Sequence, residues 1–74
     1  MIINDFKIRS YGLQELAQLY APDLTPESAT KRLSIWMRHN HQLWDELLEA
    51  GWKPGNRVLT PLQVQVILRY LGEP

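Results

Sequence analysis

The sequence predicts a mostly α fold, a compact bundle of four helices with a helix-turn-helix-like core and room for a minimal two-stranded β pairing. Apolar residues recur at helical spacing in four segments. Two Thr-Pro pairs stand where helices should begin, because threonine caps free amides and proline at the first helical position loses no hydrogen bond. A length of 74 residues provides for one core, so residues 1–74 are expected to form a single domain.

The chain opens with an alternating segment and continues into an amphipathic one. Residues 5–10 alternate polar and apolar side chains, which predicts a short strand or extended arm with Phe6 and Ile8 pointing inward. The first helix is expected over roughly residues 11–20, because apolar side chains gather on one side of it. That side consists of Leu13, Leu16, Ala17 and Tyr20.

The second helix has the clearest beginning. Thr25 can cap it, and Pro26 stands at its first position. Its apolar face consists of Ala29, Leu33, Trp36 and Met37. Residues at the centre of an apolar face should be deeply buried. Across the chain, this expectation applies to Leu16, Leu33, Trp36 and Leu47.

A third helix is expected over roughly residues 41–50, with Asn40 as its cap. Its apolar side consists of Leu43, Trp44, Leu47 and Leu48. Gly51 fits the left-handed position just past its end, and Trp52 can then fold back on Leu47.

The remaining chain predicts a turn, a strand and a last helix. Residues 53–56 have turn chemistry, and residues 57–59 can form a short strand that pairs with the N-terminal arm. Thr60-Pro61 repeats the helix start, with Gln63 placed for a capping box, and the helix should run to Leu71. Its polar face is narrow, which indicates either burial on several sides or a partner surface.

Composition restricts the classes of function. Equal numbers of bases and acids, 8 of each, give zero net charge, which argues against strong nonspecific DNA binding. The charges are nevertheless segregated: residues 30–41 and 51–70 contain bases and no acid, whereas residues 42–50 contain acids and no base. Solvated helix faces explain this pattern equally well. Residues 1–5 have neither a basic region nor a long apolar run, so we expect a cytoplasmic protein without a membrane span.

Catalysis finds little support. The absence of cysteine excludes disulfides and thiolate metal sites, and His39 and His41 have no third ligand at a suitable spacing. No glycine-rich phosphate loop is present. We therefore expect no enzyme, no cofactor, no metal and no small-molecule substrate. Three tryptophans invite a stacking hypothesis for single strands, but core packing is favoured because so small a domain needs large residues inside.

The basic face of the second helix is the best functional candidate. Lysine and arginine have the long donors that reach phosphates and guanine edges, and Ile35 can touch a thymine methyl. The turn before the last helix can add flanking phosphate contacts, like a small wing. The hypothesis of double-stranded DNA binding therefore rests on Ser28, Lys31, Arg32, Ile35, Arg38, His39, Lys53 and Arg57.

The alternative is a protein-interaction module that binds another protein or a second copy of the chain. The wide apolar circumference of the last helix and the zero net charge favour it. Its contact would be formed by Val64, Ile67, Leu68 and Leu71, or by Ile35.

Several stretches together carry a family pattern. They are Tyr11, Glu15-Leu16-Ala17, Tyr20, Pro22, Ala29, Leu33, Trp36, Leu43, Leu47, Leu48, Gly51-Trp52, Leu59-Thr60-Pro61, Gln63-Val64 and Leu71-Gly72-Glu73-Pro74. On these residues the chain resembles a bacterial family of short proteins, domain of unknown function 4248, although Leu59 stands where the family usually has an aromatic. The resemblance implies a compact bacterial domain and supplies neither a function nor a catalytic residue. The helix around Leu16 is also similar to the opening of excisionase-like and MerR-like DNA readers, a likeness of fold alone.

Overall fold

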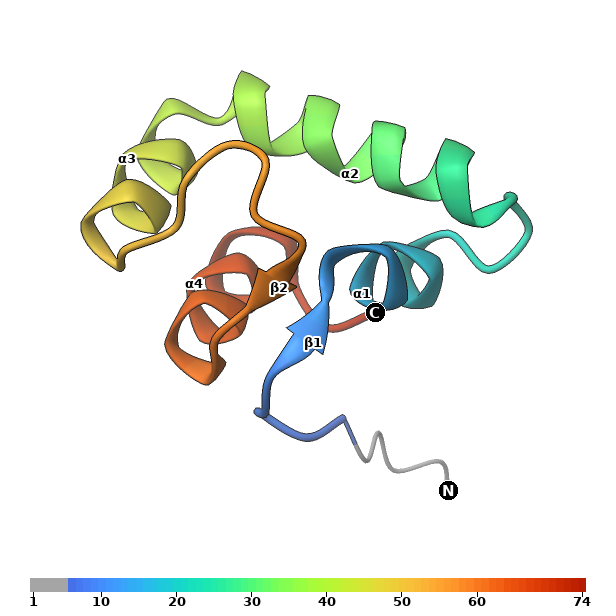
Figure 1. Ribbon diagram of the computed structural model, residues 1–74, viewed down its shortest axis with the longest axis horizontal. Helices are drawn as coiled ribbons and strands as arrows, with labels where there is room; N and C mark the ends of the chain where they lie inside the picture. Colours follow the sequence, from blue (N-terminus) through green and yellow to red (C-terminus); the bar gives the residue numbers. More distant parts are fainter. Residues whose placement is uncertain (1–5) are drawn as a thin grey trace.

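The computed structural model describes residues 6–74 of the chain. Within them the fold is mostly helical, with a small antiparallel sheet, as the sequence predicts. The elements in chain order are β1 (Tyr11–Gly12), α1 (Leu13–Tyr20), α2 (Pro26–His39), α3 (His41–Glu49), β2 (Val58–Leu59) and α4 (Pro61–Leu71) (Figure 1).

The longest helix, α2, runs along one side of the molecule, and the other elements lie on its inner side (Figure 1). α1 packs against α2, and α3 joins the end of α2 to α4 by contacting both. The two strands pair in antiparallel register, Tyr11 with Leu59 and Gly12 with Val58, and so connect the start of α1 to the start of α4. None of the other described elements therefore covers the outer face of α2.

One hydrophobic core is shared by all four helices and both strands. Leu16, Leu33 and Leu47 are fully buried, which confirms the sequence prediction for them. The prediction for Trp36 is wrong, because its side chain is 38% exposed. Leu33 and Met37 fill the space beneath the centre of the apolar face of α2. The ring of Trp36 instead lies at the edge of that face, where it meets Tyr20 edge-on with ring centroids 6.3 Å apart.

The helix ends follow from local chemistry. The Thr25 hydroxyl accepts a hydrogen bond from the Ser28 amide at 3.2 Å, and the Asn40 side chain accepts one from the Leu43 amide at 3.1 Å. At the end of α3, Gly51 adopts a φ of +92°. The Trp52 amide then donates to the Leu47 carbonyl at 3.0 Å, the bond that defines this helix ending. These caps and the ending confirm the sequence prediction.

The strand pairing forms with a different partner from the predicted one. The sequence assigned residues 5–10 to the pairing and began the first helix near Tyr11, but β2 pairs with Tyr11–Gly12 and α1 begins at Leu13. The reason is that the Leu13 amide donates to the Arg57 carbonyl at 2.7 Å, which holds this part of the chain to the other strand. Asp5, the first residue of the predicted arm, lies outside the described residues.

The arm is only partly tied to the core. Phe6 stacks on Tyr11 with ring centroids 5.1 Å apart, in agreement with its predicted inward position. Ile8 is 47% exposed, so its predicted inward position is wrong. Alternation alone does not bury a side chain when no strand of the sheet lies beside it.

The wide apolar surface of α4 is explained by burial on several sides. Val64 and Ile67 are fully buried, and Leu68 and Leu71 are partly buried against the same core. Val64 and Ile67 therefore cannot form the contact surface that the sequence proposed for them, because α3 and β2 already pack on this helix. Among the described residues, no helix has both the length and the apolarity that crossing a membrane requires.

Candidate nucleic-acid interface

The outer face of α2 presents one stripe of exposed side chains, Ser28, Lys31, Ile35 and Arg38. Their spacing of three or four positions places them one above another on the helix. The Thr25 cap and the buried Ala29, Leu33 and Met37 fix how the helix is turned, because they hold the opposite face against the core. We call these four residues the α2 stripe. Arg32 and His39 are also exposed and lie on the flank of the stripe nearer to Trp36.

The cations of this face are not neutralised by neighbouring carboxylates. In residues 6–74, ion pairs join Arg9 to Glu15 at 2.8 Å and Arg69 to Glu46 at 3.1 Å. Neither pair involves a cation of α2 or of the segment 53–57. Lys31, Arg32, Arg38, Lys53 and Arg57 are all exposed and therefore have their donors available for a ligand.

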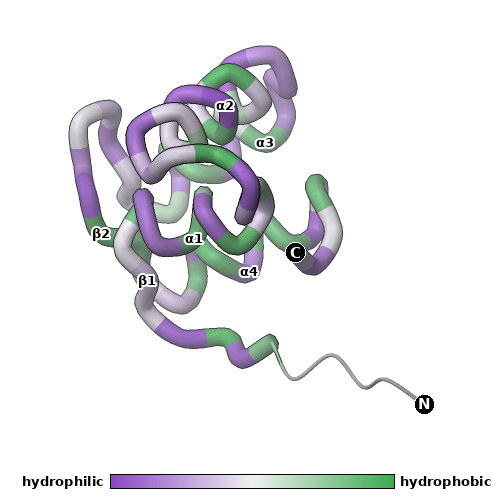
Figure 2. Tube along the Cα trace, turned by 90° about the vertical axis from the view of Figure 1, so that its right-hand side faces the viewer, coloured by the Kyte–Doolittle hydropathy of each residue, from purple (hydrophilic) through white to green (hydrophobic). Residues whose placement is uncertain are grey.

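The turn before β2 is held firmly at its base. The Asn56 amide donates to the Lys53 carbonyl at 3.0 Å, and Gly55 adopts a φ of +97°, a conformation that glycine tolerates and most residues avoid. The Arg57 carbonyl accepts from Leu13 at the start of α1. The residues just before β2 are hydrophilic (Figure 2), so this turn exposes polar side chains on a fixed backbone.

A groove with a volume of about 770 Å³ lies between this turn, the start of α1 and one flank of α2. Its lining residues are Gly12, Leu13, Gln14 and Glu15 from the start of α1, Glu27, Thr30 and Ser34 from α2, and Gly55, Asn56 and Arg57 from the turn. The groove brings Arg57 to the side of α2, whereas Lys53 is not among its lining residues.

Among the residues that line the groove, the sequence prediction included only Arg57, so it missed Glu27, Ser34 and Asn56. Ser34 had a usable signal, because it stands three positions after Lys31 and four before Arg38, which puts it beside the α2 stripe. Asn56 had no such signal. Its position beside α2 depends on the way the turn folds back across the molecule.

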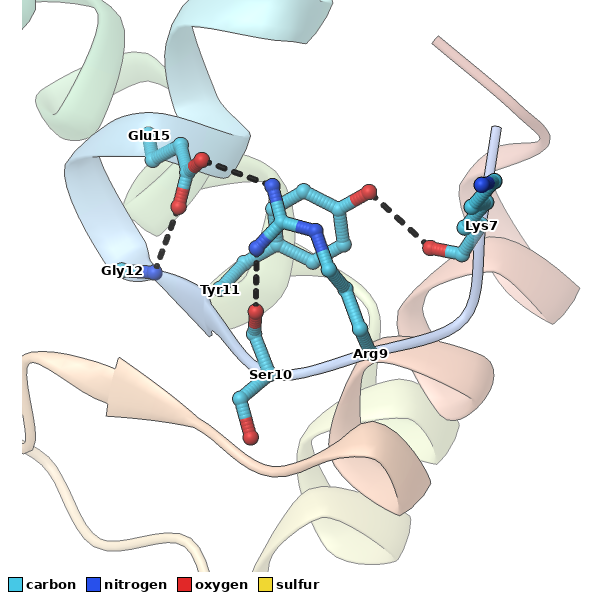
Figure 3. A network of polar contacts seen from close by, with 6 residues as sticks. All are labelled: Lys7, Arg9, Ser10, Tyr11, Gly12 and Glu15. Atoms are coloured by element: carbon cyan, nitrogen blue, oxygen red, sulfur yellow. Dashed lines mark hydrogen bonds and ion pairs between the residues drawn. The ribbon is translucent and has the colours of Figure 1, made fainter. Parts of the chain in front are cut away.

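A network of polar contacts fixes the start of α1 (Figure 3). The Arg9 guanidinium donates to the Glu15 carboxylate at 2.8 Å and to the Ser10 carbonyl at 2.6 Å, and it lies 3.7 Å from the centre of the Tyr11 ring. Glu15 also accepts a hydrogen bond from the Gly12 amide at 3.2 Å. Hydrogen bonds from Arg9 and then from Gly12 lower the pKa of Glu15. Arg9 is thereby engaged within the fold, unlike the cations of α2.

A second, smaller hollow lies where the end of α2 meets α3. Arg38, His41, Trp44 and Asp45 line it, and its volume is about 340 Å³. Trp44 packs edge-on against the buried Trp52, with ring centroids 5.3 Å apart, which favours the core role predicted for both tryptophans. Within residues 6–74, no three side chains of the metal-ligating types come together.

Comparison with known proteins identifies the chain by its family alone. The model of one family, described as domain of unknown function 4248, matches residues 7–74, which is nearly the whole chain. No curated protein and no solved structure matched. The matched range includes every element described above, from β1 to the end of α4. The chain therefore belongs to the domain of unknown function 4248 family.

Proposed function

We propose that this domain binds double-stranded DNA through α1 and α2, which act as a helix-turn-helix, with the α2 stripe docked in the major groove. The observation that supports this most directly is the exposed α2 stripe, in which Lys31 and Arg38, which have no ion-pair partner within residues 6–74, flank an exposed Ile35. α1 packs on α2. The Leu24 amide donates to the Ala21 carbonyl at 3.1 Å and so closes the turn between them. This connection is somewhat longer than the usual three or four residues.

The dimensions of α2 suit this role. With a rise of about 1.5 Å per residue, the stripe from Ser28 to Arg38 extends roughly 15 Å along the helix. The major groove of B-DNA, about 12 Å wide, admits a single helix. Ser28 is short enough to let the first turn of the helix come close to the DNA backbone, while Lys31 and Arg38 reach phosphates and guanine edges.

Because the net charge is zero, nonspecific binding should be weak and only moderately dependent on salt. Each phosphate neutralised contributes about one unit to the slope of log affinity against log salt. A domain with few phosphate contacts should therefore depend on base contacts for much of its discrimination between sites.

The experiment measures fluorescence anisotropy of labelled duplexes, both random and selected from a random library, across a salt series. Lys31→Ala and Arg38→Ala should each weaken binding and reduce the salt slope by about one unit if they contact phosphate. Lys7→Ala is the matched control, because Lys7 is exposed but lies on the arm away from α2. Circular dichroism confirms that each variant is folded. Absence of duplex binding at low salt would remove the DNA proposal.

A second candidate is a protein-interaction module that uses α2. Ile35 and Trp36 are neighbours in the chain and are 45% and 38% exposed, which is an apolar surface that a partner chain can cover. The same variants separate the two candidates. A protein contact would depend on Ile35 and Trp36 and tolerate the loss of Lys31 and Arg38.

A further inference from the structure

The groove beside α2 has two ends of different character. Ser34, Asn56 and Arg57 lie at its turn end, and none of their side chains has a hydrogen-bond or ion-pair partner within residues 6–74. Glu27 lies two helical turns before Ser34, roughly 10 Å along the α2 axis at the usual helical rise. The groove therefore offers unpaired donors at one end and a carboxylate at the other.

The charge balance of the groove depends on which carboxylates are already neutralised. Glu15 lines the groove but is held by Arg9 at 2.8 Å and by the Gly12 amide. Glu27 has no ion-pair partner within the described range. At the turn end Arg57 has no ion-pair partner among the residues that the structure describes, and the exposed Lys31 and Arg38 lie on the adjoining face of α2. An anion is therefore attracted to the turn end and repelled at the Glu27 end.

The turn end also permits close approach. A Cβ atom placed on Gly55, which lines the groove, would meet no heavy atom within 4 Å, so there is open space beside the backbone at this position. The Ser34 hydroxyl is short and lies on a helix that the Thr25 cap holds in place. Donors fixed on rigid backbone next to open space suit a phosphodiester, which offers two unesterified oxygens.

We propose that this groove receives the sugar–phosphate backbone of one DNA strand, with Ser34, Asn56 and Arg57 contacting phosphate oxygens and Glu27 limiting how far the strand enters. The proposal rests on the proposed function, because it places the strand beside a helix docked in the major groove. Beyond the proposed function, it names the sugar–phosphate backbone as the part of the DNA that the groove contacts. It also adds two hydrogen-bond donors, Ser34 and Asn56, and one carboxylate, Glu27, that weakens binding.

The test uses a duplex selected from a random library, in which single phosphates are replaced in turn by neutral methylphosphonates. Arg57→Ala should weaken binding roughly tenfold, because a hydrogen bond to a charged group is lost, and it should lower the salt slope by about one unit. Ser34→Ala should weaken binding about threefold with the slope unchanged, since no charge is lost. Glu27→Gln should strengthen binding about threefold, because a like charge near a phosphate is removed.

Glu49→Gln is the matched control for Glu27→Gln. Both are exposed helical carboxylates without an ion pair in the described range, but Glu49 lies on α3, away from the groove. It should leave binding unchanged. In addition, at least one methylphosphonate position that weakens the parent should no longer weaken Arg57→Ala, because the phosphate contact of Arg57 is already absent in that variant.

The outcomes separate this proposal from the proposed function. If Arg38→Ala weakens duplex binding while Arg57→Ala, Ser34→Ala and Glu27→Gln leave it unchanged, the groove does not hold a strand and the docking of α2 stands. If the parent does not bind any duplex at low salt, both proposals fail. If the three groove variants change affinity in the stated directions and the methylphosphonate effect disappears in Arg57→Ala, the strand lies in the groove.

Discussion

The side-chain amide of Gln63 donates a hydrogen bond to the carbonyl of Ala50 at 3.0 Å. This bond joins the first turn of α4 to Ala50, the C-cap residue of α3. The Gln63 side-chain oxygen also accepts from the Thr60 amide at 3.1 Å, and the Thr60 hydroxyl accepts from the Gln63 amide at 3.3 Å. With only 3% of its surface exposed, Gln63 satisfies two backbone groups from a buried position and fixes how α3 and α4 meet.

Gln63→Glu should test the bond to Ala50. A carboxylate keeps an acceptor for Thr60 but loses the donor and places a charge against the Ala50 carbonyl. The free energy of unfolding should fall by about 1–3 kcal/mol at neutral pH. Lowering the pH protonates the carboxyl, which can then donate, so part of the loss should be recovered. Urea denaturation at several pH values measures this.

Gln65→Glu is the control, because Gln65 is exposed on the same helix. It should change stability by no more than about 0.5 kcal/mol. If Gln63→Glu were as stable as this control at neutral pH, the hydrogen bond to Ala50 would contribute nothing to the packing of α3 on α4.

Leu47→Ala and Trp36→Ala should differ in cost despite the larger size of tryptophan. Leu47 is fully buried, so its truncation leaves a cavity and should cost about 2–5 kcal/mol. Trp36 is 38% exposed and makes its ring contact with Tyr20 at the surface, so its truncation should cost about 1–2 kcal/mol. Chemical denaturation of the two variants compares them. A larger loss for Trp36→Ala would mean that its ring is buried in solution.

The contrast between Leu47 and Trp36 shows what the sequence could and could not predict. Local sequence patterns were sufficient to predict the helix N-caps at Thr25, Asn40 and Thr60 and the C-terminal glycine at Gly51. The interacting groups in each of these motifs are only a few residues apart. The depth of Trp36 was not predictable, because helical periodicity gives the side of a helix that faces inward but not how much space the opposing elements leave there.

The same limit applies to the candidate site. The α2 stripe could be predicted, because it consists of residues on one helix face at fixed spacing. The groove could not, since it depends on the turn at Gly55 and Asn56 lying beside Ser34, far away in the sequence. The strand pairing is intermediate: one strand was predicted, but its register, Tyr11 with Leu59, required the long-range contact itself.

Tyr20 should make the fold sensitive to alkali. Burial, and then the nearby Glu73, raise the pKa of Tyr20 to about 12, and its hydroxyl donates to the Gly72 carbonyl. The unfolded chain ionises near the ordinary value of 10.0, so the stabilisation is complete below that pH and is lost as the pH rises through the folded-state pKa. The urea concentration at the midpoint of denaturation should therefore decrease as the pH rises from about 10 to 12.

Tyr20→Phe should flatten this part of the pH profile, because it removes the ionising hydroxyl. Burial also raises the pKa of Tyr70, so part of the pH dependence of the denaturation midpoint should remain. The Tyr70→Phe variant measures how much of this dependence comes from Tyr70. A Tyr20→Phe profile that is identical to the parent above pH 10 would show that Tyr20 is not responsible for the alkaline loss.

Ile35 should read a thymine methyl if the α2 stripe lies in the major groove, because it is the apolar member of the stripe and stands between Lys31 and Arg38. The probe is the selected duplex in which each thymine is replaced in turn by uracil, which lacks only the methyl group. At one thymine or more, the replacement should weaken binding about fourfold, equivalent to roughly 0.8 kcal/mol for one buried methyl. The measurement is anisotropy titration of each replaced duplex.

Ile35→Ala should bind the thymine and uracil duplexes equally, because the contact that distinguishes them is gone. Ile8→Ala is the matched control, an isoleucine of similar exposure, 47% against 45% for Ile35, that lies on the arm; it should keep the parent's preference for thymine. If the parent binds every uracil-substituted duplex as tightly as the original, Ile35 reads no methyl, even where Lys31→Ala and Arg38→Ala weaken binding. The stripe would then hold the DNA through its cations alone, and Ile35 would remain available for contact with a protein.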